Sequence, residues 1–195
     1  MTSDRSTHPG RAPRADALRN REKLIRAARS AFTGADGPVA LEDVARAAGV
    51  GIGTLYRNFP TREALVEAVY ASELDAVTGG VDRLLDEQSP EVALRTWVGR
   101  YARFFAAKRG MADTLRAGWA SGRIATPNTR QRISAALGQI LAAGTAAGTL
   151  RGDVDPDDAT AMLLGVCLST AASDTPNQLD RLLDLLLDAL RRPTE

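Results

Sequence analysis

The chain has 195 residues, and its charges almost cancel, because 25 lysine and arginine residues stand against 24 aspartate and glutamate residues. This length suits one domain or two small ones, and the whole-chain charge gives no general attraction for nucleic acid. The single cysteine, Cys167, excludes an internal disulfide and a cysteine-based zinc cluster, and the single histidine, His8, leaves little room for histidine catalysis.

The charges are unevenly distributed along the chain. Residues 1–34 hold eight basic and three acidic residues, a net charge of +5, and the remainder has a net charge of −4. A basic segment on an acidic body often marks contact with a polyanion, although a solvated tail has the same composition. Residues 1–13 contain Pro9, Gly10 and Pro13 and almost no aliphatic side chains, so we expect a disordered basic arm.

Helical periodicity begins at residue 14. Over 14–33 the apolar residues recur at three- and four-residue steps, at Leu18, Leu24, Ile25, Ala28, Ala31 and Phe32. Short helices are predicted at 41–48 and 52–58, separated by Gly49, which suits the left-handed position at a helix end. Segments with cap or proline starts predict helices at 61–86, 89–108, 126–147, 155–172 and 175–191. A short helical segment, 111–120, follows Gly110. No segment alternates with period two, so the sequence predicts an all-α fold with about nine helices.

Residues 41–60 carry the most informative motif. A helix, a glycine turn and a second short helix form the helix-turn-helix arrangement, whose second helix can enter the DNA major groove. If the apolar residues pack inward, the residues left facing outward are Gly51, Gly53, Thr54, Tyr56, Arg57 and Asn58. Glycines permit close approach to a groove wall, and hydroxyl, guanidinium and amide groups suit phosphates or base edges. Periodicity alone leaves an ordinary helical hairpin open, whereas a dinucleotide-binding glycine loop needs a preceding strand.

Three segments of the chain, 19–32, 41–49 and 52–65, resemble the DNA-binding domain of TetR-family transcriptional regulators, with Gly53-Thr-Leu-Tyr-x-x-Phe59 as the most specific part. The resemblance implies a DNA-binding domain at 14–76 after the arm at 1–13, and a regulatory and dimerisation domain at 77–195. It implies DNA contacts from the recognition helix and a phosphate contact from Arg62. It also implies that Arg14, Arg19 and Arg21 supply positive charge to the DNA backbone. Ala40 departs from the family pattern, which often has a capping serine or threonine there.

The C-terminal half resembles the family's regulatory region more loosely. The family implies a homodimer formed by the last two helices, about 155–191, and the wide leucine coverage of 177–191 agrees, although burial within one monomer remains open. The family also implies a pocket for a small effector. Its candidate lining residues are Trp97, Tyr101, Phe104, Phe105, Met111, Leu115, Trp119, Met162 and Cys167, which equally suit a plain core. Their apolar character favours a hydrophobic effector.

The remaining polar patterns predict no catalytic site. Asp153, Asp155, Asp157 and Asp158 lack the spacing of a calcium loop, and Asp155-Pro156 indicates a helix start. Cys167 on an apolar helix indicates a buried structural thiol.

We therefore expect a cytoplasmic, ligand-responsive repressor that binds a palindromic operator as a homodimer, with no metal or cofactor and no membrane segment. An all-helical enzyme and a helical scaffold are the alternatives from other classes.

Overall fold

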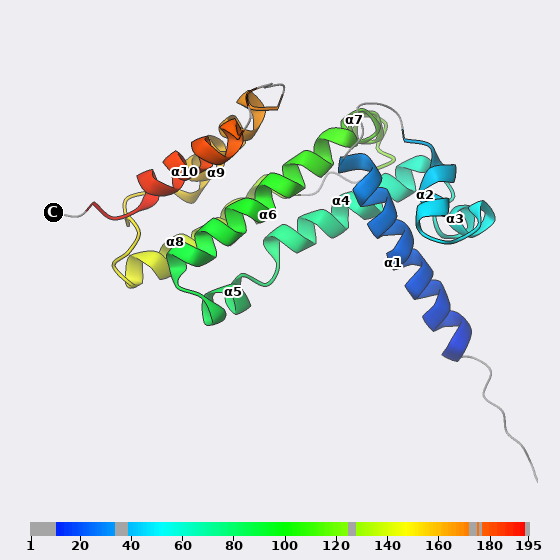
Figure 1. The fold of residues 1–195 in the computed structure, drawn as a ribbon, viewed down its shortest axis with the longest axis horizontal. Coiled ribbons are helices and arrows are strands. Elements are labelled where there is room, and N and C mark those ends of the chain that lie inside the picture. The colour runs from blue at the N-terminus through cyan, green and yellow to red at the C-terminus, as the bar shows by residue number, and fades with distance from the viewer. Residues whose placement is uncertain (1–10, 34–38, 125–127, 172–174, 176, 194–195) are drawn as a thin grey trace, which may run out of the picture. The chain divides into compact units, whose positions relative to one another are not determined.

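The computed structural model describes residues 11–33, 39–124, 128–171, 175 and 177–193, with the side chains of α1 described from residue 15 (Figure 1). Within these ranges the chain forms ten helices and one isolated antiparallel bridge, between Leu150 and Arg191. The helices are α1 (Arg11–Thr33), α2 (Leu41–Ala47), α3 (Ile52–Asn58), α4 (Arg62–Thr78), α5 (Val81–Glu87), α6 (Pro90–Gly110), α7 (Ala112–Ala120), α8 (Thr129–Ala146), α9 (Pro156–Ser169) and α10 (Gln178–Leu190). The predicted all-α class is confirmed.

The helices divide into two compact units, which we describe separately. Unit 1 consists of Met1–Ser72 and Ala107–Ala125, and unit 2 consists of Glu73–Ala106 and Thr126–Glu195. The helices α4 and α6 each contribute residues to both units.

Unit 1 is built on α1, whose inner face packs with α2 and α3. Leu24, Ala28 and Phe32 of α1 are at most 1% exposed, and Val44 and Leu55 are fully buried. The end of α6 approaches the end of α1 so closely that a Cβ built on Gly110 would overlap the carbonyl oxygen of Phe32. A glycine is therefore required at this position for packing, because any side chain would force the two helices apart.

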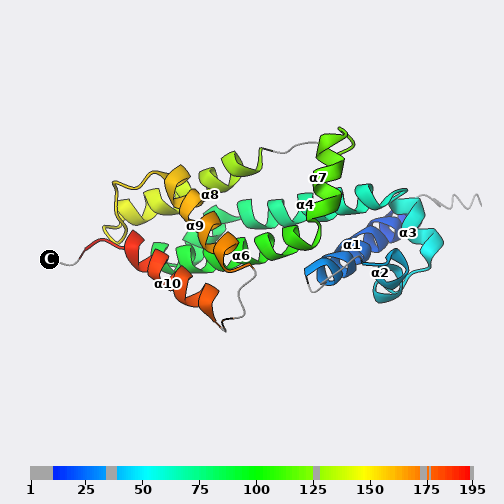
Figure 2. The ribbon, with the colours of Figure 1, turned by 90° about the horizontal axis from the view of Figure 1, so that it is seen from above.

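Unit 2 is organised around the aromatic face of α6. The Trp97 ring is fully buried, lies 5.9 Å from the Tyr101 ring in a stacked arrangement, and donates from Nε1 to the Val77 carbonyl oxygen at 2.8 Å. In Figure 2, α9 lies alongside both α8 and α10. Arg132 of α8 also donates to the end of α4, at 2.7 Å to Asp75 Oδ1 and 2.8 Å to Thr78 Oγ1.

The structure corrects the predicted helix over 61–86. This segment forms two helices, α4 and α5, because Gly79 and Gly80 interrupt it and Gly80 adopts a left-handed φ of 69°. A left-handed residue cannot continue a right-handed helix, so the glycine pair ends α4 and resets the direction of the chain.

Both ends of the chain also differ from the expectation. Helix α1 begins at Arg11, three residues before the predicted start, because proline is tolerated in a first turn, where the N–H groups have no helical partner. The side chain of Leu18, predicted inside, is 63% exposed. Helix α10 begins at Gln178 instead of near Thr175, because Asn177 has a left-handed φ of 57°. The rest of the predicted arm, residues 1–10, lies outside the described residues.

None of the helices in the described ranges combines the length and the apolar character that crossing a bilayer requires.

Candidate nucleic-acid interface

The turn between α2 and α3 has the geometry that the glycine at position 49 predicts. Gly49 has a left-handed φ of 68°, its N–H donates to the Arg46 carbonyl at 3.0 Å, and the Val50 N–H donates to the Ala45 carbonyl at 3.0 Å. These two bonds form the capping pattern that ends a helix at a left-handed residue. They fix the direction in which α3 leaves the turn.

The short helix α3 is anchored at its centre and its end. Leu55 is fully buried and Phe59 is 2% exposed. The guanidinium of Arg21, from α1, lies 4.7 Å above the Phe59 ring. This cation–π contact places a positive charge beside the C-terminal end of α3, where the helix dipole also favours it.

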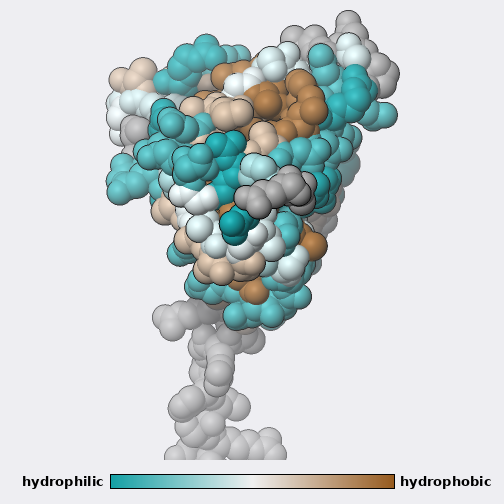
Figure 3. Space-filling view, turned by 90° about the vertical axis from the view of Figure 1, so that its left-hand side faces the viewer, coloured by the Kyte–Doolittle hydropathy of each residue, from teal (hydrophilic) through white to brown (hydrophobic). Residues whose placement is uncertain are grey.

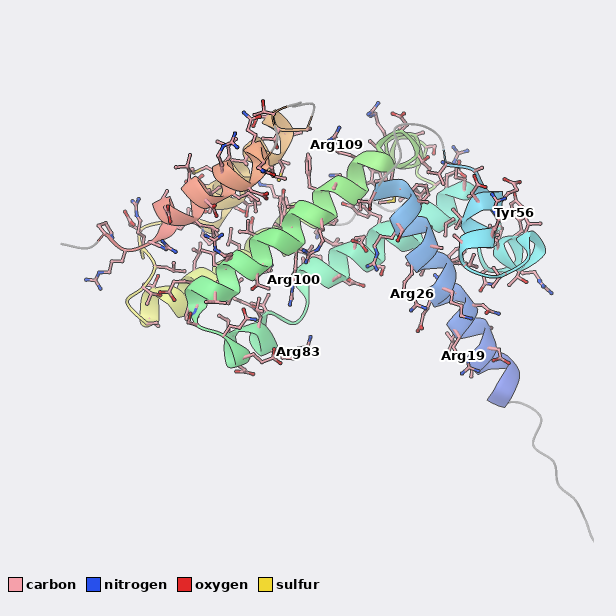
Figure 4. The ribbon with its side chains drawn as sticks, in the orientation of Figure 1. Arg19, Arg26, Tyr56, Arg83, Arg100 and Arg109 are labelled. Carbon is pink, nitrogen blue, oxygen red and sulfur yellow. The ribbon has the colours of Figure 1, made fainter. Side chains whose placement is uncertain are left out.

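The outer face of α3 carries four of the predicted contact residues. Tyr56 is 46% exposed and projects from the helix in Figure 4. Arg57 is exposed and lies along its own helix, donating from Nε to the Gly53 carbonyl at 3.1 Å and from Nη2 to Thr54 Oγ1 at 2.9 Å. Asn58 donates from Nδ2 to the Thr54 carbonyl at 2.8 Å. These bonds hold Thr54, Arg57 and Asn58 as one polar cluster and leave several N–H groups of Arg57 available to a partner.

Gly51 and Gly53 lie at the start of α3 and are exposed. A Cβ built on either one meets no atom of the protein within 4 Å, and neither glycine has a positive φ. Neither the backbone nor the packing of this chain therefore requires glycine there. Gly51 is the N-cap of α3, a position where glycine is favoured over alanine, so it has a local role. Gly53 lies inside the first turn, where glycine costs stability relative to alanine, so its bare surface needs a reason outside the chain.

The first turn of α4 follows α3 directly. Arg62 donates from Nη1 to the Val39 carbonyl at 2.6 Å, and its guanidinium lies 5.8 Å from the centroid of the Phe32 ring. Thr61 caps the helix by accepting the Ala64 N–H at 3.2 Å, as the sequence predicts. The bond to Val39 was not foreseen, since backbone carbonyls leave no signal in a sequence. Arg62 thus holds the segment before α2 in place through this hydrogen bond, and it is also a candidate for a phosphate contact.

The remaining basic candidates lie on α1. Arg19 is exposed and forms an ion pair with Asp16, and in Figure 4 it lies on the same helix as Arg26. Arg14 belongs to the first turn of α1, and its side chain lies outside the described part.

Ala40 precedes α2 and makes no side-chain capping bond, in agreement with the departure noted in the sequence. Glu63 follows Arg62 in the first turn of α4, and its pKa is lowered mainly by a backbone hydrogen bond and further by Arg123 at 3.5 Å and by Arg62.

Two family models match the chain. One, described as bacterial regulatory proteins of the tetR family, matches residues 24–69, and the other, described as the SbtR-like transcriptional regulator C-terminal domain, matches residues 89–192. The chain belongs to the TetR family. This membership identifies a transcriptional regulator with a DNA-binding helix-turn-helix, not an enzyme.

Solved structures of TetR regulators have the same fold. A TetR transcriptional regulator from Streptomyces coelicolor is 45% identical, covers 89% of this chain and 99% of its own, and superposes with a TM-score of 0.82. A TetR regulatory protein from Mycobacterium vanbaalenii is 33% identical, covers 92% and 99%, and has a TM-score of 0.72. No curated protein matches this sequence.

The candidate effector-lining residues fall into both units. Met111, Leu115 and Trp119 lie in unit 1, and the other six lie in unit 2. Seven of the nine are buried or half-buried aromatic or aliphatic side chains, Cys167 is also buried, and Met162 is 56% exposed. An open pocket of about 700 Å³ between the starts of α8 and α9 is lined by none of the nine. The effector set stays a prediction, and the exposure of Met162 argues against an interior role for it.

Two further sequence interpretations are settled by local geometry. Asp155 caps α9 by accepting the Asp157 N–H at 2.7 Å, which confirms the capping interpretation. Cys167 is 2% exposed, and burial raises the pKa of its thiol to about 11. The protonated, buried thiol is a structural group, as predicted.

Proposed function

We propose that this TetR-family regulator is a repressor, which binds a palindromic operator as a homodimer and releases it when a small effector binds. The observation that carries the DNA-binding part is the face of α3. The exposed Gly53 has no structural reason within the chain, and it lies with the N-cap Gly51 beside the exposed Tyr56 and the hydrogen-bonded cluster of Thr54, Arg57 and Asn58. Such a surface suits close approach to a groove wall together with phosphate and base contacts.

The contact set has three parts. Thr54, Tyr56, Arg57 and Asn58 contact the major groove, with Gly51 and Gly53 at the closest approach, and Arg62 contacts a phosphate with the N–H groups that Val39 does not use. Arg14, Arg19 and Arg21 on α1 add positive charge that attracts the DNA backbone. The domain at 14–76 carries these contacts after a basic arm at 1–13, and the regulatory domain occupies 77–195. Since the partner is chromosomal DNA, we place the protein in the cytoplasm.

Dimerisation is assigned to α9 and α10. Their buried faces pack inside unit 2, yet four large apolar side chains remain exposed: Met162, Leu164 and Leu168 of α9 and Leu185 of α10. In Figure 3 hydrophobic residues gather in the upper part of the surface. Large exposed apolar side chains on two helices that pack together favour a surface that is covered in solution, and two-fold symmetry would set the two recognition helices about 34–36 Å apart, one turn of DNA.

A gel shift with the DNA upstream of the protein's own gene tests the proposal. Tyr56→Ala and Arg57→Ala are each expected to weaken binding by about 1–3 kcal/mol, as lost base or phosphate contacts do. The matched control is Arg83→Ala, since Arg83 is an exposed arginine of α5, 3.8 Å from Glu87, and outside unit 1. Unchanged binding by both α3 variants would refute the placement of the recognition helix.

A further inference from the structure

Two hydrogen-bond donors of unit 1 have no acceptor among the residues that the structure describes. The first is the indole Nε1–H of Trp119, in α7, which is buried and has no hydrogen-bond partner in the described part of the chain. The Trp119 side chain as a whole is half-buried. An unpaired buried donor costs free energy and is rare in native proteins, so it calls for an explanation.

The second donor is the ammonium group of Lys108, in the last turn of α6. Its Nζ lies 5.7 Å from the centroid of the Trp119 ring, and the side chain is half-buried. Burial lowers the pKa of Lys108, and no carboxylate among the described residues forms an ion pair with it. A partly desolvated ammonium without a counter-charge is costly, so both neighbouring donors favour an acceptor from outside the chain.

The surroundings of Trp119 hold its ring in a defined position. Tyr70 of α4 contacts the ring edge-on, with the centroids 5.7 Å apart and an interplanar angle of 76°. Gly118, the preceding residue, is packed so tightly that a Cβ there would overlap the side chain of Ile124. The indole group is therefore oriented by packing and not by a hydrogen bond of its own.

We infer that Trp119 Nε1 and Lys108 Nζ bind one carboxylate group of a small organic acid. An ionised carboxylate can accept from both donors and also neutralises the ammonium charge. A neutral ester or amide carbonyl would satisfy the indole and leave the ammonium without a counter-charge. That the bound acid is the effector rests on the proposed function.

The position of this site suits an effector. Tyr70, which touches Trp119, belongs to α4, and only three residues separate the end of α3 at Asn58 from the start of α4 at Arg62. An acid seated against Tyr70 and Trp119 therefore contacts the helix that follows the recognition helix. A ligand shifts the equilibrium toward whichever position of α4 it binds better.

The test uses ¹⁵N-indole NMR of the full-length protein, which has two tryptophans. The Trp97 Nε1–H donates to the Val77 carbonyl and serves as an internal reference, and a Trp119→Phe spectrum assigns the other signal. The probes are benzoate, phenylacetate and octanoate, each beside its primary amide. We expect at least one carboxylate to shift the Trp119 signal downfield and saturably while the Trp97 signal stays in place.

Variants separate the two donors from general effects. Lys108→Met is expected to weaken the carboxylate titration at least tenfold, and Arg109→Met, at the exposed neighbouring position labelled in Figure 4, should leave it unchanged. Three outcomes overturn the site: no shift with any carboxylate at millimolar concentration, equal shifts with the amides, or no effect of Lys108→Met.

The NMR titration needs no DNA, so it stands apart from the proposed function. A gel shift with the carboxylate that binds tests the effector role: release of the operator supports it. A carboxylate that shifts the Trp119 signal without releasing DNA supports the site and overturns its role as the effector site.

Discussion

Gly53→Ala is expected to raise the stability of the protein and to weaken its binding to DNA. The added Cβ would meet no protein atom within 4 Å, and Gly53 has no positive φ, so the native fold accepts alanine without strain. Such a substitution stabilises by about 0.4–1 kcal/mol, chiefly because the unfolded chain loses conformational freedom. For a protein of this size that corresponds to an increase in Tm of roughly 1–4 °C.

The same methyl group lies on the face proposed to approach the groove wall. We expect operator affinity to fall about tenfold or more, which equals about 1.4 kcal/mol. Thermal unfolding measures the first effect, and a gel shift or fluorescence anisotropy at fixed salt measures the second.

Gly99→Ala is the matched control for this variant. Gly99 lies within α6, and a Cβ there would be in ordinary contact, at 3.9 Å, with the mobile end of Arg103. It should raise Tm similarly and leave operator affinity unchanged. A stabilised Gly53→Ala variant with full affinity would show that α3 does not approach DNA through Gly53, and a destabilised variant would contradict the open space around it.

Three other variants test separate parts of the structure. Leu168→Glu, on the exposed face of α9, should convert a dimer to a monomer in sedimentation equilibrium, whereas Val92→Glu, equally apolar and 52% exposed on α6, should not. Gly110→Ala should lower the unfolding free energy by at least about 1–3 kcal/mol in denaturant titration, because its Cβ would overlap the Phe32 carbonyl. Cys167, with its pKa raised to about 11, should resist alkylation at pH 8, where roughly one thiol in a thousand is ionised, and react fully in denaturant; rapid labelling of the native protein would contradict its burial.

The sequence predicted the features that depend on local rules. Gly49 at the turn, Thr61 and Asp155 as caps, and Pro90 at the start of α6 all lie where their backbone preferences place them. Leu55 and Phe59 are buried, as the periodicity of the helix-turn-helix required.

Features that depend on tertiary contacts were not predicted. The exposure of Leu18 reflects the lack of packing partners along the first turns of α1, which an amphipathic pattern cannot reveal. The contacts of Arg21 with Phe59 and of Arg62 with the Val39 carbonyl join residues far apart in the sequence. The break at Gly79 and Gly80, by contrast, had a clear signal in the glycine pair, and the regular apolar spacing on either side concealed it.

The hydrogen bonds of Arg57 bear on the entropy of DNA binding. A free arginine side chain that becomes fixed at an interface loses rotamer freedom, on the order of 1.5–2 kcal/mol. In this protein the bonds from Arg57 to Thr54 and Gly53 already restrict that freedom before any DNA arrives. On the proposed contact of Arg57 with DNA, the threonine hydroxyl contributes to affinity through the free protein, so we expect Thr54→Val to weaken that contact even where Thr54 itself touches no base.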